Sequence, residues 1–326
     1  MAEKEQHITS IGGQAVMEGV MMRGPYKTVV AVRKPDGEIE KKIDDNGTKT
    51  RNKFFKLPIV RGCVNFIDSL IIGMKALMFS AEFMDIEGDE EEEESKFDKW
   101  LEDKLGDKIK DVVIYFAIFI SIIFSIGVFM LLPAFLTKLV EAIPGIQSIT
   151  SAHAFTSIFE GILRMAIFLG YMALVANMKE IKRVFEYHGA EHKTIACYEA
   201  GEELNVENVR KQKRFHPRCG TSFLLFVMII SILLFALLPR FDGFGAILST
   251  LLRLGTRLLL LPVVAGLSYE VIKLAGRSKN RCVALLSKPG LWLQKLTTRE
   301  PDDSQIEVAI ASMIPCIPEN KEDDRW

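Results

Sequence analysis

An uncharged run of 21 residues, 112–132 (VVIYFAIFISIIFSIGVFMLL), limits what this chain can fold into more than any other feature of its sequence. A helix of that length rises about 30 Å, which is the thickness of the hydrocarbon core of a bilayer. Because such a helix is apolar on every side, it needs lipid or a large protein interior around it. We therefore expect a membrane protein, although 25% of the 326 residues are charged.

The overall composition excludes three other classes of protein. The 41 Lys and Arg residues balance 42 Asp and Glu residues, which argues against a basic nucleic-acid-binding protein. With 49% hydrophobic and 9% aromatic residues, the chain is too apolar to be wholly disordered. Five cysteines are too few for a disulfide scaffold. We expect the lipid bilayer as a partner and no nucleic acid.

Four segments are expected to cross the membrane: 112–132, about 152–176, 222–238 and about 246–272. The second and the fourth contain charged residues, so each has an interfacial or half-buried helix as its alternative. The number of Lys and Arg residues outside the spans alternates along the chain as 18, 1, 9, 1 and 9. Since positive charge is retained in the cytoplasm, we expect both termini and the 177–221 loop on that side.

These features predict a mainly α, polytopic α-helical membrane protein with about four transmembrane helices and amphipathic interfacial helices. A small N-terminal cytoplasmic region is expected to contain a β-hairpin, because two β-like runs flank Pro35-Asp36-Gly37. The expected segments are a Gly-rich and β-hairpin region (1–58), an interfacial amphipathic helix whose period is too interrupted to span (59–84), an acidic linker (85–111), a first transmembrane pair (112–176), a cytoplasmic metal-motif loop (177–221), a second transmembrane pair (222–272) and a cytoplasmic tail with interfacial helices (273–326).

The 177–221 loop contains His188-Gly189-Ala190-Glu191-His192, which matches the inverted zincin pattern H-x-x-E-H. At about 100° per residue on a helix, His188, Glu191, His192 and Glu199 share one face. Two imidazoles one turn apart can bind one divalent ion, and the carboxylate can complete the shell or accept a proton from metal-bound water. Cys197 falls on the opposite face and is expected not to be a ligand.

A second group of candidate ligands precedes the third span, in the sequence RFHPRCGTSF. A proline that fixes the backbone and a glycine that frees it allow His216 and Cys219 to converge from a tight turn. Both are candidates for a third or fourth ligand of a divalent metal ion, with zinc as the expected metal. The alternative is that His188 and His192 lie on an exposed helix and that His216 caps the next span.

Four strings of the sequence also resemble a known family: IGGQAVMEGVMMRGP (11–25), EYHGAEHKTIACYEAGEELNVENV (186–209), RFHPRCGTSF (214–223) and PGLWLQKLTTREPDDSQIEVAIASM (289–313). They are similar to the YqhQ-like family of bacterial membrane proteins, often labelled predicted metal-dependent enzymes. The resemblance covers nearly the whole chain apart from the acidic linker and the last dozen residues. It implies a multi-pass protein of the bacterial cytoplasmic (inner) membrane, but it implies no substrate, proven cofactor or catalytic residue.

The Gly-rich stretch 12–25 adds two candidate contacts for a substrate or an anion. Its four glycines surround Glu18 and Arg23, a composition that favours a close-approach loop rather than a regular element. Glu18 is a candidate ligand or base, and Arg23 is a candidate anion clamp. The alternative is a turn held by one local ion pair.

Four charged residues at membrane depth are further candidate contacts: Glu160, Arg164, Arg253 and Arg257. They lie at matching depths of the second and fourth spans, and such charges are unfavourable in lipid unless something anionic or aqueous faces them. One hypothesis therefore places the two helices on either side of a wet or headgroup-accessible cavity. In the other, Glu160 pairs with one arginine while the others snorkel or pair across an oligomer.

The tail is expected to contain two short helices. Residues 289–296 predict an interfacial helix, and a polar run beginning at Asp302 predicts the N-terminal cap of a helix over 304–314. The alternative role for Glu300, Asp302 and Asp303 is metal binding.

The first functional hypothesis is a membrane-embedded, metal-dependent hydrolase, with zinc as the expected cofactor and the site at the cytoplasmic face. His188 and His192 would be ligands, with Glu199 or His216 as the third. Glu191 would be the general base. Lipids, peptides and membrane proteins meet at such a site, so an amide or ester bond in one of them is the expected substrate. The competing hypothesis is a non-enzymatic protein of transport or partner recruitment, whose structural metal is held by four ligands, for instance His188, His192, His216 and Cys219.

Overall fold

The computed structural model describes residues 7–47, 53–84, 109–143, 153–239, 241, 243–277 and 281–325. The chain divides into two compact units. The first contains residues 1–84, 170–234 and 256–326, and the second contains residues 85–169 and 235–255. Most of the predicted acidic linker, including its Glu-rich run, lies outside the described residues.

An antiparallel sheet of four strands in the order β1-β2-β3-β4 opens the first unit. Its strands are β1 (Gly12–Val16), β2 (Gly19–Arg23), β3 (Lys27–Arg33) and β4 (Ile39–Asp45). The predicted hairpin is confirmed, since β3 pairs with β4 across a turn in which Gly37 has a φ of 89°. That conformation is open to glycine and strained for most other residues.

The prediction of an irregular loop over 12–25 is wrong, because this stretch forms the β1–β2 hairpin. Composition suggested a loop, but the glycines lie where neighbouring strands approach closely. A Cβ atom on Gly19 would lie 2.4 Å from the Ala31 carbonyl oxygen, and one on Gly13 would lie 2.6 Å from that of Met21. The glycines therefore permit close packing within a regular sheet.

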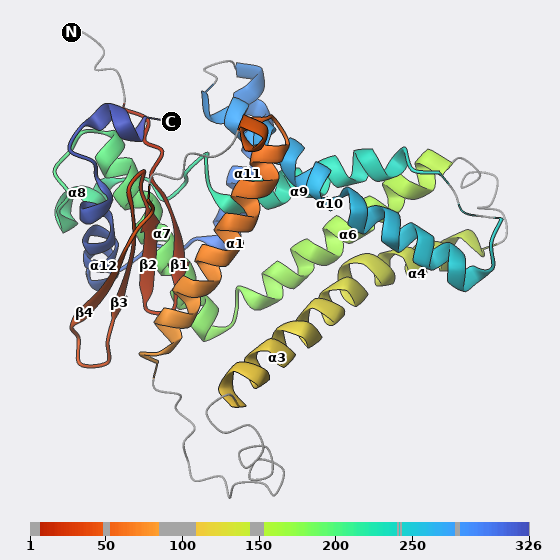
Figure 1. The fold of residues 1–326 in the computed structure, drawn as a ribbon, viewed down its shortest axis with the longest axis horizontal. Coiled ribbons are helices and arrows are strands. Elements are labelled where there is room, and N and C mark those ends of the chain that lie inside the picture. The colour runs from red at the N-terminus through yellow and green to blue at the C-terminus, as the bar shows by residue number, and fades with distance from the viewer. Residues whose placement is uncertain are drawn as a thin grey trace, which may run out of the picture. The chain divides into compact units, whose positions relative to one another are not determined.

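Helices cover both faces of this sheet, as the alternation of side chains along the strands requires. On one face, Val20, Met22, Val29 and Ala31 belong to a core shared with α7 (Lys179–Glu199) and α12 (Asp303–Met313). On the other face, strand residues pack against α1 (Val60–Ala81). Figure 1 shows α1 and α12 on either side of the strands. In this three-layer arrangement, α7 packs against β1 and β2, the strands of the Gly-rich hairpin.

The remaining elements are mostly helices. The second unit contains α3 (Ile109–Ile126), a π-helical turn (Gly127–Leu131), α4 (Leu132–Glu141) and most of α6 (His153–Val175). The first unit is completed by α8 (Val206–Lys211), most of α9 (Gly220–Ala236), much of α10 (Ala246–Arg277), α11 (Arg281–Thr297), and the short 3₁₀ turns Lys53–Lys56, Ile314–Cys316 and Lys321–Asp324.

Among the described residues, four helices are long and apolar enough to cross a membrane, which supports the predicted class of membrane protein. Their spans are Val60–Ala81, Phe116–Glu141, Phe155–Val175 and Ile247–Leu274. Three of them match predicted spans. The remaining one, Val60–Ala81 in α1, lies where the sequence predicted an interfacial helix. The predicted span 222–238 instead forms α9, which is shorter, with 17 residues. The side of the membrane on which each loop and terminus lies stays a prediction.

Candidate metal centre

Helix α7 carries an unusual number of buried polar side chains along its second half. Glu191, His192, Lys193 and Glu199 are each between 1% and 7% exposed. Buried polar groups destabilise a fold unless hydrogen bonds or ligands satisfy them, so each of these side chains should have a partner.

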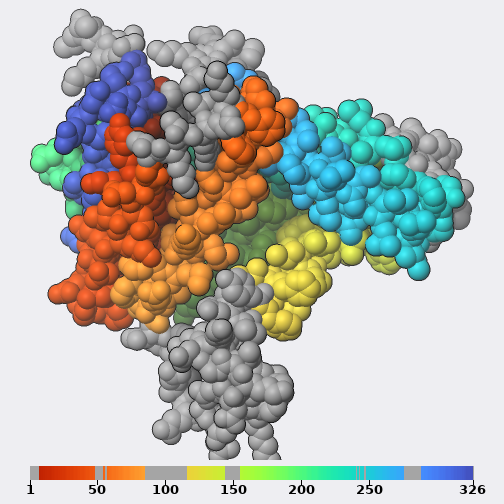
Figure 2. Space-filling model, in the orientation of Figure 1, coloured from red at the N-terminus to blue at the C-terminus, as the bar shows by residue number. Residues whose placement is uncertain are grey.

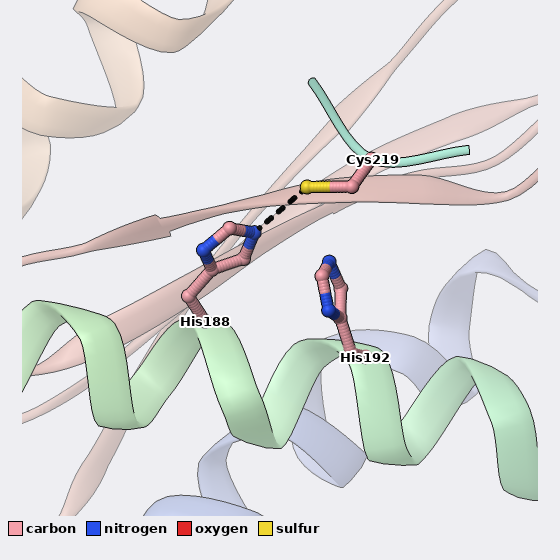
Figure 3. A group of neighbouring side chains, drawn as sticks. All are labelled: His188, His192 and Cys219. Carbon is pink, nitrogen blue, oxygen red and sulfur yellow. Dashed lines mark hydrogen bonds between the residues drawn. The ribbon is translucent and has the colours of Figure 1, made fainter. Parts of the chain in front are cut away.

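Three side chains of the described residues form a compact group of metal-ligand type: His188, His192 and Cys219. One ligand atom from each lies within 4.8 Å of the other two. Figure 3 shows both imidazoles rising from the same side of α7, one turn apart, with Cys219 reaching them from another segment of the chain. The ring centroids of His188 and His192 are 4.4 Å apart, and His188 Nε2 lies 3.1 Å from Cys219 Sγ.

Backbone carbonyl groups fix the orientation of both imidazoles. Nδ1 of His188 donates to the Thr297 carbonyl oxygen at 2.8 Å, and Nδ1 of His192 donates to that of Arg214 at 2.6 Å. When Nδ1 carries the proton in this way, Nε2 is left to bind a metal. Nε2 of His192 is buried without a hydrogen-bond partner. A metal ion would satisfy that atom.

Cys219 has the electrostatic surroundings of a thiolate. Burial raises the pKa of its thiol, but His188, followed by His192, outweighs burial and holds the pKa well below its usual value. The converse applies to His188: burial lowers its pKa, whereas Cys219 raises it, with a net rise to about 9. The Cys219 thiol and the His188 imidazole share a proton in such a pair. A metal cation that binds both residues displaces this proton, as zinc does when it binds cysteine ligands.

Glu191 lies beside this group with one carboxylate oxygen unused. Its Oε2 atom is buried and has no hydrogen-bond partner. Burial raises the pKa of Glu191, while His188, His192 and a hydrogen bond from the Gly13 backbone lower it, with a net rise. A Cβ atom on Gly13 would lie 3.0 Å from Cδ of Glu191, so the glycine of β1 leaves room for the carboxylate.

A cavity of about 280 Å³ opens onto these side chains. Its walls come from β1, β2, α1, α7 and the segment before α9, and they include Gln14, Arg23, Ile72, Glu191, His192 and Cys219. Glu191 and two of the three metal-ligand side chains, His192 and Cys219, therefore line one hollow that can admit a small molecule or part of a larger one.

The two predicted alternatives for a third ligand lie close by but have other partners. Glu199 accepts hydrogen bonds from the Thr9 backbone N–H at 2.9 Å and from Arg218. Burial raises the pKa of Glu199, but the opposing effect of His216 and Arg218 is larger, so the pKa is lowered overall. His216 lines the cavity, with its ring centroid 5.7 Å from that of His192 and its Nε2 atom 3.6 Å from Glu199. Burial lowers the pKa of His216, and the nearby Glu199 offsets part of this effect.

The two candidate contacts of the Gly-rich hairpin, Glu18 and Arg23, have different surroundings in the structure. Glu18, in the β1–β2 turn with a φ of 47°, pairs with Arg183 and accepts a hydrogen bond from the Tyr187 hydroxyl at 3.1 Å. It therefore pairs with α7 rather than within its own turn. Arg23, at the end of β2, lines the cavity.

In α6, Glu160 pairs with an arginine of its own helix. The Glu160 carboxylate lies 2.8 Å from Arg164 Nη2, and Arg164 Nε donates to the Phe129 carbonyl oxygen at 2.7 Å. This is the pairing foreseen as the alternative to a wet cavity. The hypothesis that Arg253 and Arg257 of α10 face Glu160 and Arg164 stays a prediction.

The acidic residues of the tail stabilise the scaffold. Asp302 caps α12 by accepting from the Gln305 backbone N–H at 2.9 Å, which confirms the predicted cap. Asp303 pairs with Arg210, and Glu300 lies 2.6 Å from Lys193 Nζ. None of the three belongs to the metal-ligand group.

As predicted, Cys197 is no member of that group either. It lies in the core shared by the sheet, α7 and α12.

Sequence reasoning missed the residues that support the ligands. Gln294 of α11 accepts from the His216 backbone N–H at 2.9 Å and donates to the His216 carbonyl oxygen at 2.7 Å. It thus holds the segment that carries Cys219 against α11. A lone glutamine in an apolar helix gives no sequence signal of such a role, and the carbonyl groups of Thr297 and Arg214 give none at all.

The comparisons with known proteins agree with the sequence resemblance. The family described as "Protein of unknown function (DUF1385)" matches residues 57–319. The uncharacterized protein YqhQ of Bacillus subtilis (strain 168) is 39% identical over 306 residues, which are 92% of this chain and 90% of that protein. No solved structure matches the chain. The resemblance to YqhQ-like proteins is confirmed, and the chemistry has to be argued from the geometry.

Proposed function

The chain belongs to the DUF1385 family of proteins of unknown function, and we propose that it is a metal-dependent hydrolase of the membrane. His188, His192 and Cys219 would hold one zinc ion, and Glu191 would act as the general base. The observation that carries this proposal is the pair of unused buried atoms, His192 Nε2 and Glu191 Oε2, beside a cysteine with a lowered thiol pKa.

The residues present fit a zinc ion by the chemistry of the donor set. Two imidazole nitrogens and one thiolate are borderline-soft ligands that zinc binds, and three protein ligands are the number found at catalytic zinc sites. Such an ion polarises a carbonyl group and lowers the pKa of water to about 7. The backbone carbonyls of Thr297 and Arg214 already hold both imidazoles in the tautomer that the ion needs.

Glu191 supplies the proton transfer that hydrolysis requires. Glu191 is one of the residues that line the cavity, and its carboxylate would accept a proton from an attacking water and return it to the leaving group. The first unit thus supplies ligands, base and cavity from within one compact body.

A structural metal site is the second candidate function, and the position of His216 favours it. Its ring lies next to that of His192, so a small rotation would add a fourth ligand and close the site. Against this, His216 already interacts with Arg218 at 3.2 Å and is held near Glu199.

Cobalt substitution separates the two candidates. The full chain in detergent, loaded with Co²⁺ in place of zinc, should show a thiolate charge-transfer band that Cys219→Ser abolishes and Cys197→Ser retains. Adding acetohydroxamate should change the visible spectrum of the wild type and of Glu191→Gln, because an open position accepts the probe. A spectrum that acetohydroxamate leaves unchanged indicates four protein ligands and contradicts the hydrolase.

A further inference from the structure

A larger hollow adjoins the metal cavity within the first unit. It is a groove of about 970 Å³ between α1 and the outer strands of the sheet, and it shares Arg23 and Ile72 with the cavity of about 280 Å³. Figure 2 shows α1 and the strands side by side on the face of the molecule in view. A ligand bound in this groove would therefore lie next to the cavity of the candidate metal centre.

The groove has the length of a short extended peptide. Its lining on α1 and the C-cap of that helix runs from Asn65 to Glu82. At 1.5 Å per residue, this stretch of helix is about 26 Å long. An extended chain rises about 3.3 Å per residue, so about eight peptide residues would fill the groove.

The lining mixes charge of both signs with apolar side chains. Val30, Ile71 and Phe79 supply apolar surface. An acyl chain would have to pass seven charged groups, and an anionic lipid headgroup would meet more acids than bases. A polypeptide of mixed sequence can match both kinds of surface. The charged lining residues are three cations and four acids: Arg23, Lys42, Lys75, Asp44, Asp45, Asp68 and Glu82.

One wall of the groove is an edge strand. β4 is last in the strand order and pairs only with β3 among the described residues. Its residues from Glu40 to Asp45 are all exposed. An exposed edge presents backbone N–H and C=O groups that can pair with an added extended segment.

We propose that this groove binds an extended polypeptide segment and presents it to the metal cavity, so that the bond hydrolysed is a peptide bond. The proposal rests on the hydrolase function proposed above. Water adds to the peptide carbonyl carbon, the C–N bond breaks, and Glu191 passes the proton taken from the water to the leaving amine. The products are a carboxylic acid and an amine, which become a carboxylate and an ammonium group when the second proton of the water moves to the amine, and no further reactant is needed.

Photo-crosslinking at two neighbouring positions of α1 tests the occupant. Ile71 lines the groove and is 51% exposed, whereas Leu70, next to it and 56% exposed, does not line it. The full chain with Glu191→Gln, in phospholipid nanodiscs, carries benzoylphenylalanine at position 71 or 70 and is irradiated with a library of random 12-residue peptides. We expect peptide labelling at position 71 at least tenfold above that at position 70.

Charge substitutions on β4 supply the second readout. Lys42 lines the groove and Lys41, its exposed neighbour, does not. Lys42→Glu should shift the crosslinked peptides from acidic toward basic sequences, and Lys41→Glu should leave them unchanged. Equal labelling at positions 70 and 71, or lipid in place of peptide at position 71, overturns the proposal.

The outcomes for the groove and for the metal centre are distinguishable because crosslinking needs no catalysis. Peptide labelling at position 71 together with a closed cobalt site rejects the hydrolase but retains a peptide-binding groove. An open cobalt site with lipid at position 71 rejects the peptide substrate alone.

Discussion

Helices α6 and α7 both bury an acidic side chain, yet they satisfy it in opposite ways. Glu160 of α6 is 4% exposed and Glu191 of α7 is 5% exposed. The first pairs with Arg164 one turn along its own helix, and Arg164 also donates to a carbonyl oxygen of the π-helical turn. The second leaves one carboxylate oxygen without a partner, and His192, the next residue of α7, leaves one imidazole nitrogen without a partner.

The difference shows that burial of charge does not by itself mark a reactive site. A buried pair that its own neighbours satisfy can be a purely structural feature. Polar atoms that a folded chain leaves unsatisfied are destabilising, and they need an explanation such as a ligand. On this reasoning α7 carries the chemistry and α6 carries part of the scaffold, and the following variants test that division.

The largest expected effect comes from breaking the ion pair of α6. Arg164→Ala removes the guanidinium that pairs with the buried Glu160 carboxylate, which should lower the free energy of unfolding by about 3–5 kcal/mol. Zinc content should be unchanged, as measured by elemental analysis of the purified protein. The double variant Glu160→Leu with Arg164→Met should recover most of the stability in thermal unfolding. Loss of zinc in the folded double variant would show that α6 contributes to the site.

A smaller effect is expected from Gly189→Ala, between the two histidines of α7. A Cβ atom there would lie 2.0 Å from the Arg299 carbonyl oxygen, so the segment that supplies the Thr297 carbonyl must shift. Loss of that support for His188 should weaken zinc binding about 10–100-fold. Competition with a chelator measures the affinity, with Gly170→Ala as the control because no atom lies within 4 Å of its added Cβ. Equal affinities of the two variants would contradict the support assigned to Thr297.

The smallest effect is expected from Asp302→Ala, which removes the cap of α12. Stability should fall by about 1 kcal/mol, since one backbone N–H loses its acceptor. Zinc affinity should stay within twofold of the wild type, because Asp302 caps α12 and binds no metal ligand. Asp302→Ser should restore the stability, and a large loss of zinc affinity in either variant would place the tail in the site.

Local chemistry made several elements predictable from the sequence. The turn at Gly37 and the cap at Asp302 follow from residue types within four positions of one another, and the helical period placed His188 and His192 together on α7. The Gly-rich hairpin was missed because composition alone does not distinguish a loop from strands that pack closely.

Of the two residues predicted as a third ligand, Glu199 lies outside the metal-ligand group of the described residues for a geometrical reason. Glu199 shares a face of α7 with His188, but it lies 11 residues further along, a rise of about 16 Å. Two residues on the same face of a helix can therefore be too far apart along its axis to bind one metal ion. Gln294, more than 70 residues away, holds the segment that carries Cys219, and no local pattern reveals such a contact.

X-ray absorption at the zinc edge of the purified full chain tests the central claim most directly. The three-ligand centre predicts one sulfur at about 2.3 Å and nitrogen or oxygen neighbours at about 2.0–2.1 Å. Two of those neighbours should show imidazole scattering, and the sulfur should disappear in Cys219→Ser but remain in Cys197→Ser. A first shell without sulfur in the wild type, or one with sulfur that survives Cys219→Ser, would contradict a centre built on His188, His192 and Cys219.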